Sequence, residues 1–209
     1  MWRCGCRAVN RSPTQATRCD KTGGSNNGRE YAKLATSNGW EVKSPSREYL
    51  NLPAEVRQEI DGFLAEHPVK LGAIAERLGV KVLLSTLPRG TSGQIGQEDG
   101  DFVIRINRHE AKHRQRFTLA HELAHFLLHR ERIVAEGGWS ENVLLRAPNQ
   151  PIQIEYEANR LASDLVIPSN LLAKATADYG GPMTSEVIED LARRFGVSTA
   201  AMEIKLQMV

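Results

Sequence analysis

Apolar residues recur at helical spacing through most of the chain, and in a few short stretches they form runs typical of strands. Two helices are predicted within residues 53–79, the first beginning at a proline and the second ending at a glycine. Strand-forming runs follow at residues 80–84 and 102–106, and glycines such as Gly93 mark turns around a shorter strand at residues 94–97. This pattern predicts a small antiparallel sheet ahead of the main helices.

The second half of the chain is predicted to be mainly helical. One helix begins at about Glu110 or Arg114 and ends at His129, a loop at residues 134–150 turns the chain back, and another helix occupies residues 152–166. We predict an α+β fold, with the sheet packed on a mainly helical single domain at residues 46–209. Within that domain, residues 183–209 form a C-terminal helix pair.

Residues 1–45 contain few large apolar side chains and include a run of glycine, serine and asparagine. Such a segment cannot bury enough apolar surface to offset the entropy cost of ordering, so we predict a disordered N-terminal extension. Its first 29 residues hold six basic residues and one acidic residue, which leaves 21 basic and 24 acidic residues in residues 30–209. Direct nucleic-acid binding is not expected of a slightly acidic body.

All three cysteines, Cys4, Cys6 and Cys19, lie in this extension. An odd number of cysteines with no partner in the folded part argues against a disulfide-stapled secreted domain and favours a reducing compartment. No apolar run approaches the roughly 18 residues that a membrane span needs, and the start of the chain lacks the apolar core of a signal peptide. We therefore expect a cytoplasmic protein with no membrane segment.

The run from Phe117 to Leu128 is apolar except for a threonine near its start and three further polar residues, His121, Glu122 and His125. His121 and His125 are four residues apart, so their rings lie one above the other on one helical face, where they can bind one zinc ion. Glu122 lies between them, outside the shell of ligands but close enough to act as a general base. The run therefore predicts a catalytic zinc site with His121 and His125 as ligands and Glu122 as the base.

A third ligand is expected from the helix at residues 152–166, because a catalytic zinc site needs three protein ligands and an open position. Glu155 shares a face with small residues and with Asn159, which could hydrogen-bond a ligand, and we favour it. Glu157 is the alternative, but it falls on what we interpret as a solvated charge stripe. His129 is about 11 Å of helix rise from His121, too far to share the ion, and we interpret it as a residue at the helix C-terminus.

Three segments together carry a resemblance to a known family: Arg114–His129, Glu155–Pro168 and Phe195–Ser198. In order and spacing, they resemble the ImmA/IrrE family of zinc-dependent peptidases over about residues 68–207. Ala124 stands where many members have glycine, and a few other apolar positions differ, but the proposed ligands are intact.

The resemblance implies a zincin-like core of the gluzincin type, in which His121, His125 and Glu155 bind zinc and Glu122 is the catalytic base. It also implies site-specific cleavage of a helix-turn-helix repressor of the Xre type, in settings such as stress responses. A non-cleaving regulator, or a binding protein of the toxin–antitoxin kind that keeps the peptidase fold, is the alternative, although the intact Glu122 argues against it. The residues leave several candidates open for stabilising the oxyanion: His109, His113, Tyr156 and Tyr179.

The last two predicted helices also look like a helix-turn-helix unit around residues 191–198. The second helix, however, offers only Lys205 as a basic residue and is mostly apolar. Its composition favours packing inside the protein over reading a DNA groove.

Overall fold

The computed structural model describes residues 33–35, 40–142 and 152–207, all within the compact unit that spans Tyr31–Val209. The N-terminal elements are β1 (Lys33–Ala35), β2 (Glu41–Lys43), α1 (Arg47–Leu50), α2 (Ala54–Asp61), the 3-10 helix η1 (Gly62–Ala65) and α3 (Leu71–Arg77). The central elements are β3 (Val80–Ser85), β4 (Thr91–Glu98), β5 (Asp101–Asn107), α4 (Lys112–Glu136) and β6 (Trp139–Asn142). The C-terminal elements are α5 (Ile152–Val166), α6 (Ser169–Thr176), α7 (Ser185–Phe195) and α8 (Thr199–Lys205). The predicted α+β class is confirmed.

The main sheet is mixed, with the strand order β3-β5-β4-β6, so the prediction of an antiparallel sheet was wrong in one pairing. β4 pairs antiparallel with both β5 and β6, but β3 runs parallel to β5. β5 lies inside the sheet, between β3 and β4, and buries four apolar side chains: Phe102, Val103, Ile104 and Ile106. β3 exposes Leu83 and Leu84 and takes an edge. A sequence pattern alone does not reveal that β5 inserts between two earlier strands.

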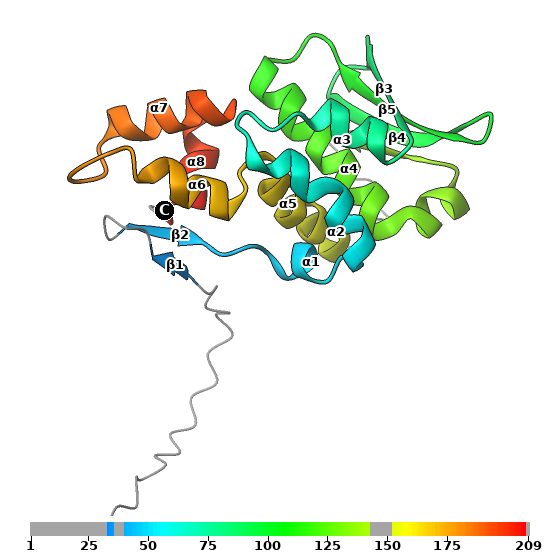
Figure 1. Cartoon of the computed structure of the whole chain (residues 1–209). Coiled ribbons are helices and arrows are strands. Elements are labelled where there is room, and N and C mark those ends of the chain that lie inside the picture. The colour runs from blue at the N-terminus through cyan, green and yellow to red at the C-terminus, as the bar shows by residue number, and fades with distance from the viewer. Residues whose placement is uncertain (1–32, 36–39, 143–151, 208–209) are drawn as a thin grey trace, which may run out of the picture. The chain divides into compact units, whose positions relative to one another are not determined.

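α4 lies between the sheet and α5 (Figure 1). On one side Phe126 meets Phe102 of β5 edge to face, with 4.9 Å between ring centroids. On the other side α4 and α5 make the most extensive contact of any two described elements. Both helices bury alanines completely, namely Ala120, Ala124, Ala158 and Ala162. Side chains this small allow two helices to approach closely.

α4 continues beyond its predicted end at His129 and stops at Gly137, which has a left-handed φ of 75°. At His129 the backbone leaves helical values, with φ −131° and ψ 20°, so the helix is broken there without ending. The expected loop after α4 contains β6, which joins the edge of the sheet beside β4.

The fold begins earlier than the predicted boundary at residue 46. β1 and β2 form a small antiparallel hairpin, and Val42 is completely buried in the core. The backbone N–H of Ser46 donates to the buried carboxylate of Asp164 at 2.7 Å, which ties this segment to α5. The predicted disorder of residues 1–32 and 36–39 lies outside the described residues.

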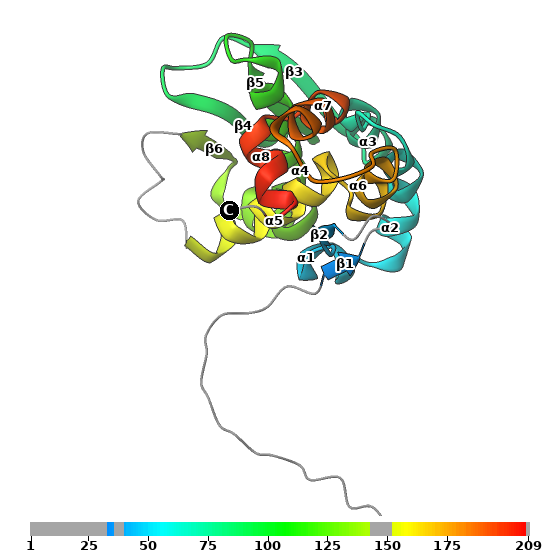
Figure 2. The same cartoon turned by 90° about the vertical axis from the view of Figure 1, so that its left-hand side faces the viewer.

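At the other end of the chain, α7 and α8 correspond to the predicted helix pair (Figure 2). Thr184 and Ser198 cap their N-termini, and Gly196, with φ 67°, ends α7. Lys205 is 3% exposed and donates to Asp164 at 2.6 Å, so the one basic side chain of the second helix faces the interior. α6 was not predicted. In the described part of the chain, no helix is long and apolar enough to cross a bilayer.

Val42→Ala tests whether the N-terminal hairpin belongs to the folded unit. Removing two buried carbon atoms should lower the free energy of unfolding by about 2 kcal/mol. Val134→Ala, at a site that is 47% exposed, is the matched control and should change it by less than about 0.5 kcal/mol. Urea unfolding measures both. Equal, small effects would place the hairpin outside the cooperative core.

Candidate metal centre

The three predicted ligand side chains converge between α4 and α5. His121 Nε2 lies 2.9 Å from His125 Nε2, and both lie close to the Glu155 carboxylate, at 3.3 and 3.4 Å. Among the described residues these three form the one cluster of histidine, cysteine and acidic side chains that could hold a metal ion. The two imidazoles are almost completely buried, whereas the Glu155 side chain is 23% exposed. The centre is therefore open on the side of α5.

The spacing of these atoms suits a single ion. Tetrahedral ligands with bonds of about 2.0–2.2 Å lie about 3.3–3.6 Å apart, close to the separations found here. Two imidazole nitrogens and one carboxylate oxygen also form a donor set that zinc accepts readily. The residues present therefore fit a divalent metal.

Asn159 lies where the sequence predicted a partner for a ligand. Its side-chain oxygen is 3.1 Å from His121 Nδ1, and an amide oxygen can only accept, so His121 carries its proton on Nδ1. The Nε2 lone pair of His121 then faces the centre. This is the usual arrangement for a metal-binding histidine.

The protonation of the other two ligands also suits a cation. Burial lowers the pKa of His125 to about 4, against an opposing effect of Glu155, so the ring is neutral at pH 7. Burial alone would raise the pKa of Glu155, but the two imidazoles beside it outweigh burial and lower that pKa, so Glu155 is a carboxylate at neutral pH.

Glu122 is 1% exposed and lies against β4, where Gly93 makes room for it. A Cβ atom at Gly93 would lie 2.5 Å from Glu122 Oε1 and 2.6 Å from Thr118 Cγ2. Sequence reasoning placed Gly93 in a turn and missed this role. Its position inside β4 is the signal that could have found it, because a glycine within a strand often marks a close approach.

The interpretation of His129 as a residue at a helix end was wrong. Its side chain is 10% exposed, and burial lowers its pKa. His129 Nδ1 lies 3.2 Å from His125 Nδ1, and His129 Nε2 lies 3.3 Å from Glu157 Oε2. His129 is therefore in contact with a candidate ligand, although it is not one of the clustered ligands itself.

The solvated charge stripe predicted along α5 was wrong as well. Glu157 reaches across to His129, and Arg160 makes two hydrogen bonds to the buried carboxylate of Glu48. Asp164 is 4% exposed and bonds Ser46 and Lys205. Spacing along a helix identifies shared faces, but it does not reveal which other elements cover them.

Trp139 covers the histidines from β6, a second contribution that the sequence did not indicate. Its ring is perpendicular to the ring of His125, with 5.0 Å between centroids, and lies 5.9 Å from the ring of His129. The indole N–H donates to Glu136 at 2.8 Å, which fixes the orientation of the ring. Trp139 thereby shields this side of the centre from water.

Two of the candidate oxyanion donors have other hydrogen-bond partners. The hydroxyl of Tyr179 donates to Asp190, and the His109 ring bonds Thr86 at 3.3 Å. Tyr156, which follows Glu155 on α5, is 51% exposed, and His113 is also exposed.

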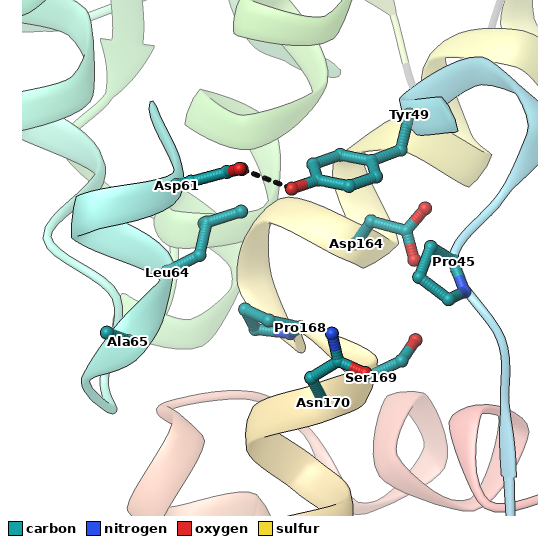
Figure 3. A pocket seen from close by; sticks show the side chains of 9 residues that line it. All are labelled: Pro45, Tyr49, Asp61, Leu64, Ala65, Asp164, Pro168, Ser169 and Asn170. Atoms are coloured by element: carbon teal, nitrogen blue, oxygen red, sulfur yellow. Dashed lines mark hydrogen bonds between the residues drawn. The ribbon is translucent and has the colours of Figure 1, made fainter. Parts of the chain in front are cut away.

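Two cavities lie along α5. Figure 3 shows one of them, with a volume of about 240 Å³. The Tyr49 hydroxyl donates to Asp61 on one side of it, and Asp164 and Ser169 also line its wall. None of the three clustered ligands lines this cavity. The other, of about 250 Å³, is lined mainly by polar and charged side chains, among them Asn159, and by the exposed Tyr156 and Ile204. None of the three clustered ligands lines it, but Asn159 also contacts His121.

Comparisons with known proteins identify relatives of the chain. The family model described as the IrrE N-terminal-like domain matches residues 75–207, which include all the residues of the centre. The chain is 34% identical over 113 residues to the radiation response metalloprotease IrrE of Deinococcus deserti, covering 52% of this chain and 34% of that protein. A solved structure, a Mycobacterium tuberculosis transcriptional regulator, matches with a TM-score of 0.45 and 16% identity, over 73% of this chain and 46% of that one. The match thus spans about a third of the curated relative and about half of the solved structure.

Removing a ligand should remove the metal. The purified protein should bind about one zinc ion per chain, and His121→Ala or His125→Ala should abolish tight binding because only two protein ligands would remain. Glu155→Ala should weaken binding strongly for the same reason. Metal analysis after dialysis measures this, with exposed His113→Ala as the control. Full occupancy in all the ligand variants would rule out this site.

Gly93→Ala should be much more costly than the same change at Gly96 of the same strand. The new methyl group would collide with Glu122 and Thr118, which should lower the free energy of unfolding by about 1–3 kcal/mol. At Gly96 the nearest atom to the new Cβ is Gly138 Cα at 3.5 Å, an ordinary contact. Thermal unfolding of both variants measures the difference, and equal stabilities would show that β4 does not fit tightly against Glu122.

Proposed function

The chain belongs to the ImmA/IrrE family of metallopeptidases, the family of the IrrE N-terminal-like domain, and on that premise we propose that it is a zinc-dependent endopeptidase. One observation carries the proposal. Three ligand atoms from α4 and α5 lie within 4.8 Å of one another, and the buried Glu122 directly follows the first ligand in the chain.

The chemistry divides between the metal and the protein. A zinc ion held by His121, His125 and Glu155 would lower the pKa of a bound water toward about 7 and polarise the scissile carbonyl. The carboxylate of Glu122 accepts a proton from the attacking water and passes it to the leaving amine. The missing side chain of Gly93 leaves the space beside β4 that this carboxylate occupies.

The arrangement is of the gluzincin type, because two histidines come from one helix and a glutamate from a later helix supplies the third ligand. The partial exposure of Glu155 leaves an approach for a peptide on the side of α5. The neighbouring cavity, with Tyr156 on its wall, offers space for a substrate side chain.

The substrate that we propose is one partner protein, a helix-turn-helix repressor of the Xre type. The family resemblance points to this class, and cleavage of a repressor would make the enzyme a regulator of transcription in stress responses. The described fold is small, with little room for a broad cleft beside its core, which favours a docked partner over proteins in general. We place the activity in the cytoplasm because the three cysteines fit a reducing compartment.

The competing function is that of a regulator that binds the repressor without cutting it. Such a protein has no need of a buried carboxylate next to its metal ligands. The presence of Glu122, together with a glycine that makes room for it, therefore favours hydrolysis over binding alone.

Glu122→Gln should separate binding from cleavage. The amide keeps the shape of the side chain but cannot accept the proton, so cleavage of the proposed helix-turn-helix repressor should fall by about 10²–10⁴-fold while binding is retained. Intact mass spectrometry follows the cleavage, and Glu131→Gln, an exposed change on the same helix, is the control.

Three outcomes decide between the functions. Zinc-dependent cleavage by the wild type and its loss in Glu122→Gln support the peptidase. Cleavage that persists in Glu122→Gln, or after removal of zinc, contradicts the mechanism. Binding by the wild type without cleavage under any condition favours the regulator.

A further inference from the structure

A chain of three polar side chains leads away from the centre on the side of His125. His125 Nδ1 lies 3.2 Å from His129 Nδ1, and the opposite nitrogen of His129 lies 3.3 Å from the Glu157 carboxylate. Gln153 donates to the other oxygen of this carboxylate at 2.7 Å. The side chains of His125 and His129 are 4% and 10% exposed, so the contact between these two rings is largely shielded from solvent, whereas Glu157 is 27% exposed.

The Glu157 carboxylate, at the outer end of this series of hydrogen bonds, determines which ring nitrogen of each histidine carries the proton. An ionised carboxylate can only accept hydrogen bonds, so His129 donates from Nε2. A neutral imidazole carries one proton, so the Nδ1 of His129 is left as an acceptor. The contact between the two Nδ1 atoms then requires His125 to be the donor. His125 Nε2 therefore holds its lone pair toward His121 and Glu155.

We infer that His129 and Glu157 are positioning residues that fix the tautomer and the ring orientation of the metal ligand His125. His129 accepts a hydrogen bond from Nδ1 of His125, just as Asn159 accepts one from Nδ1 of His121. Each histidine ligand therefore has its own hydrogen-bond partner outside the centre. The inference rests on the metal-binding part of the proposed function and is independent of hydrolysis.

The backbone supports this assignment. At His129 the φ and ψ angles leave helical values inside an otherwise continuous α4, at the residue whose ring meets both His125 and Glu157. The ring of Trp139 packs on both histidines and restricts their rotation. A simple ion pair between α4 and α5 would need only the contact of His129 with Glu157, and it would not require the Nδ1 atom of His129 to face a ligand.

The arrangement also explains why three acceptors can face one another. With both histidine Nε2 lone pairs directed inward, the centre presents two nitrogens and a carboxylate at separations of 2.9–3.4 Å and no proton among them. Such a group of acceptors is repulsive until a cation lies between them. The outer hydrogen bonds hold it in the form that a metal requires.

The tautomer can be measured directly in the metal-free full-length protein. Ring ¹⁵N chemical shifts at neutral pH should show His125 protonated on Nδ1 and unprotonated on Nε2, with the signals assigned by single histidine substitutions. The Glu157→Ala and His129→Phe variants should lose this preference. Glu157→Gln should restore it in part, because the amide oxygen still accepts from His129. A wild-type His125 protonated on Nε2 would overturn the inference, even if every variant failed to fold.

Zinc affinity provides the second measurement. Competition with a chelator should give binding about 10–100-fold weaker for His129→Phe and Glu157→Ala, and closer to wild type for Glu157→Gln. Glu131→Ala, which removes an exposed carboxylate from α4, should leave the affinity unchanged. Equal affinities in Glu157→Ala and Glu131→Ala would show that Glu157 contributes only charge or packing. Failure of the wild type to bind zinc would instead contradict the proposed function, while the tautomer measurement would still test the positioning.

Discussion

The position of every candidate ligand depends on how closely α4 approaches α5. His121 and His125 come from one helix and Glu155 from the other, so their common centre exists only where the two helices touch. Completely buried alanines on both helices permit this approach. A larger side chain at Ala124 or Ala158 would force the helices apart, and a change of about 1 Å is half the length of a zinc–ligand bond. The alanine faces therefore matter to the metal as much as to the core.

The part of the centre that the sequence predicted is the part governed by local geometry. The spacing of His121 and His125 within one helix, and the shared face of Glu155 and Asn159, depend only on helical periodicity, and the structure places all four side chains accordingly. Glu157 was assigned to solvent because periodicity assumes that a side chain interacts along its own helix. Gln153 of α5 does donate to it, but its other partner, His129, lies on α4.

The rest of the fold escaped prediction for similar reasons. Trp139 belongs to a strand of four residues, too short to show a period, and its partner β4 lies far away in sequence. The parallel pairing of β3 with β5 is a choice of neighbour, which alternation of side chains does not encode. The N-terminal hairpin contains few apolar residues, so its sequence does not indicate a folded element. It is folded because Val42 packs into a core that later elements build.

Asp164 of α5 connects the first and last segments of the folded unit. One of its oxygens accepts from Ser46 near the start of the unit, and the other accepts from Lys205 near its end; Asp164 itself is buried. Both ends of the unit are thus fastened to α5, the helix that carries Glu155. Removing Lys205 would leave the buried charge of Asp164 without its ion-pair partner, a loss that commonly costs about 3–5 kcal/mol, whereas removing Ser46 would cost it one hydrogen bond. The sheet with α4 and α5 therefore depends on both flanking segments, and a change at Ser46 or Lys205 acts directly on a residue of the helix that carries the third ligand.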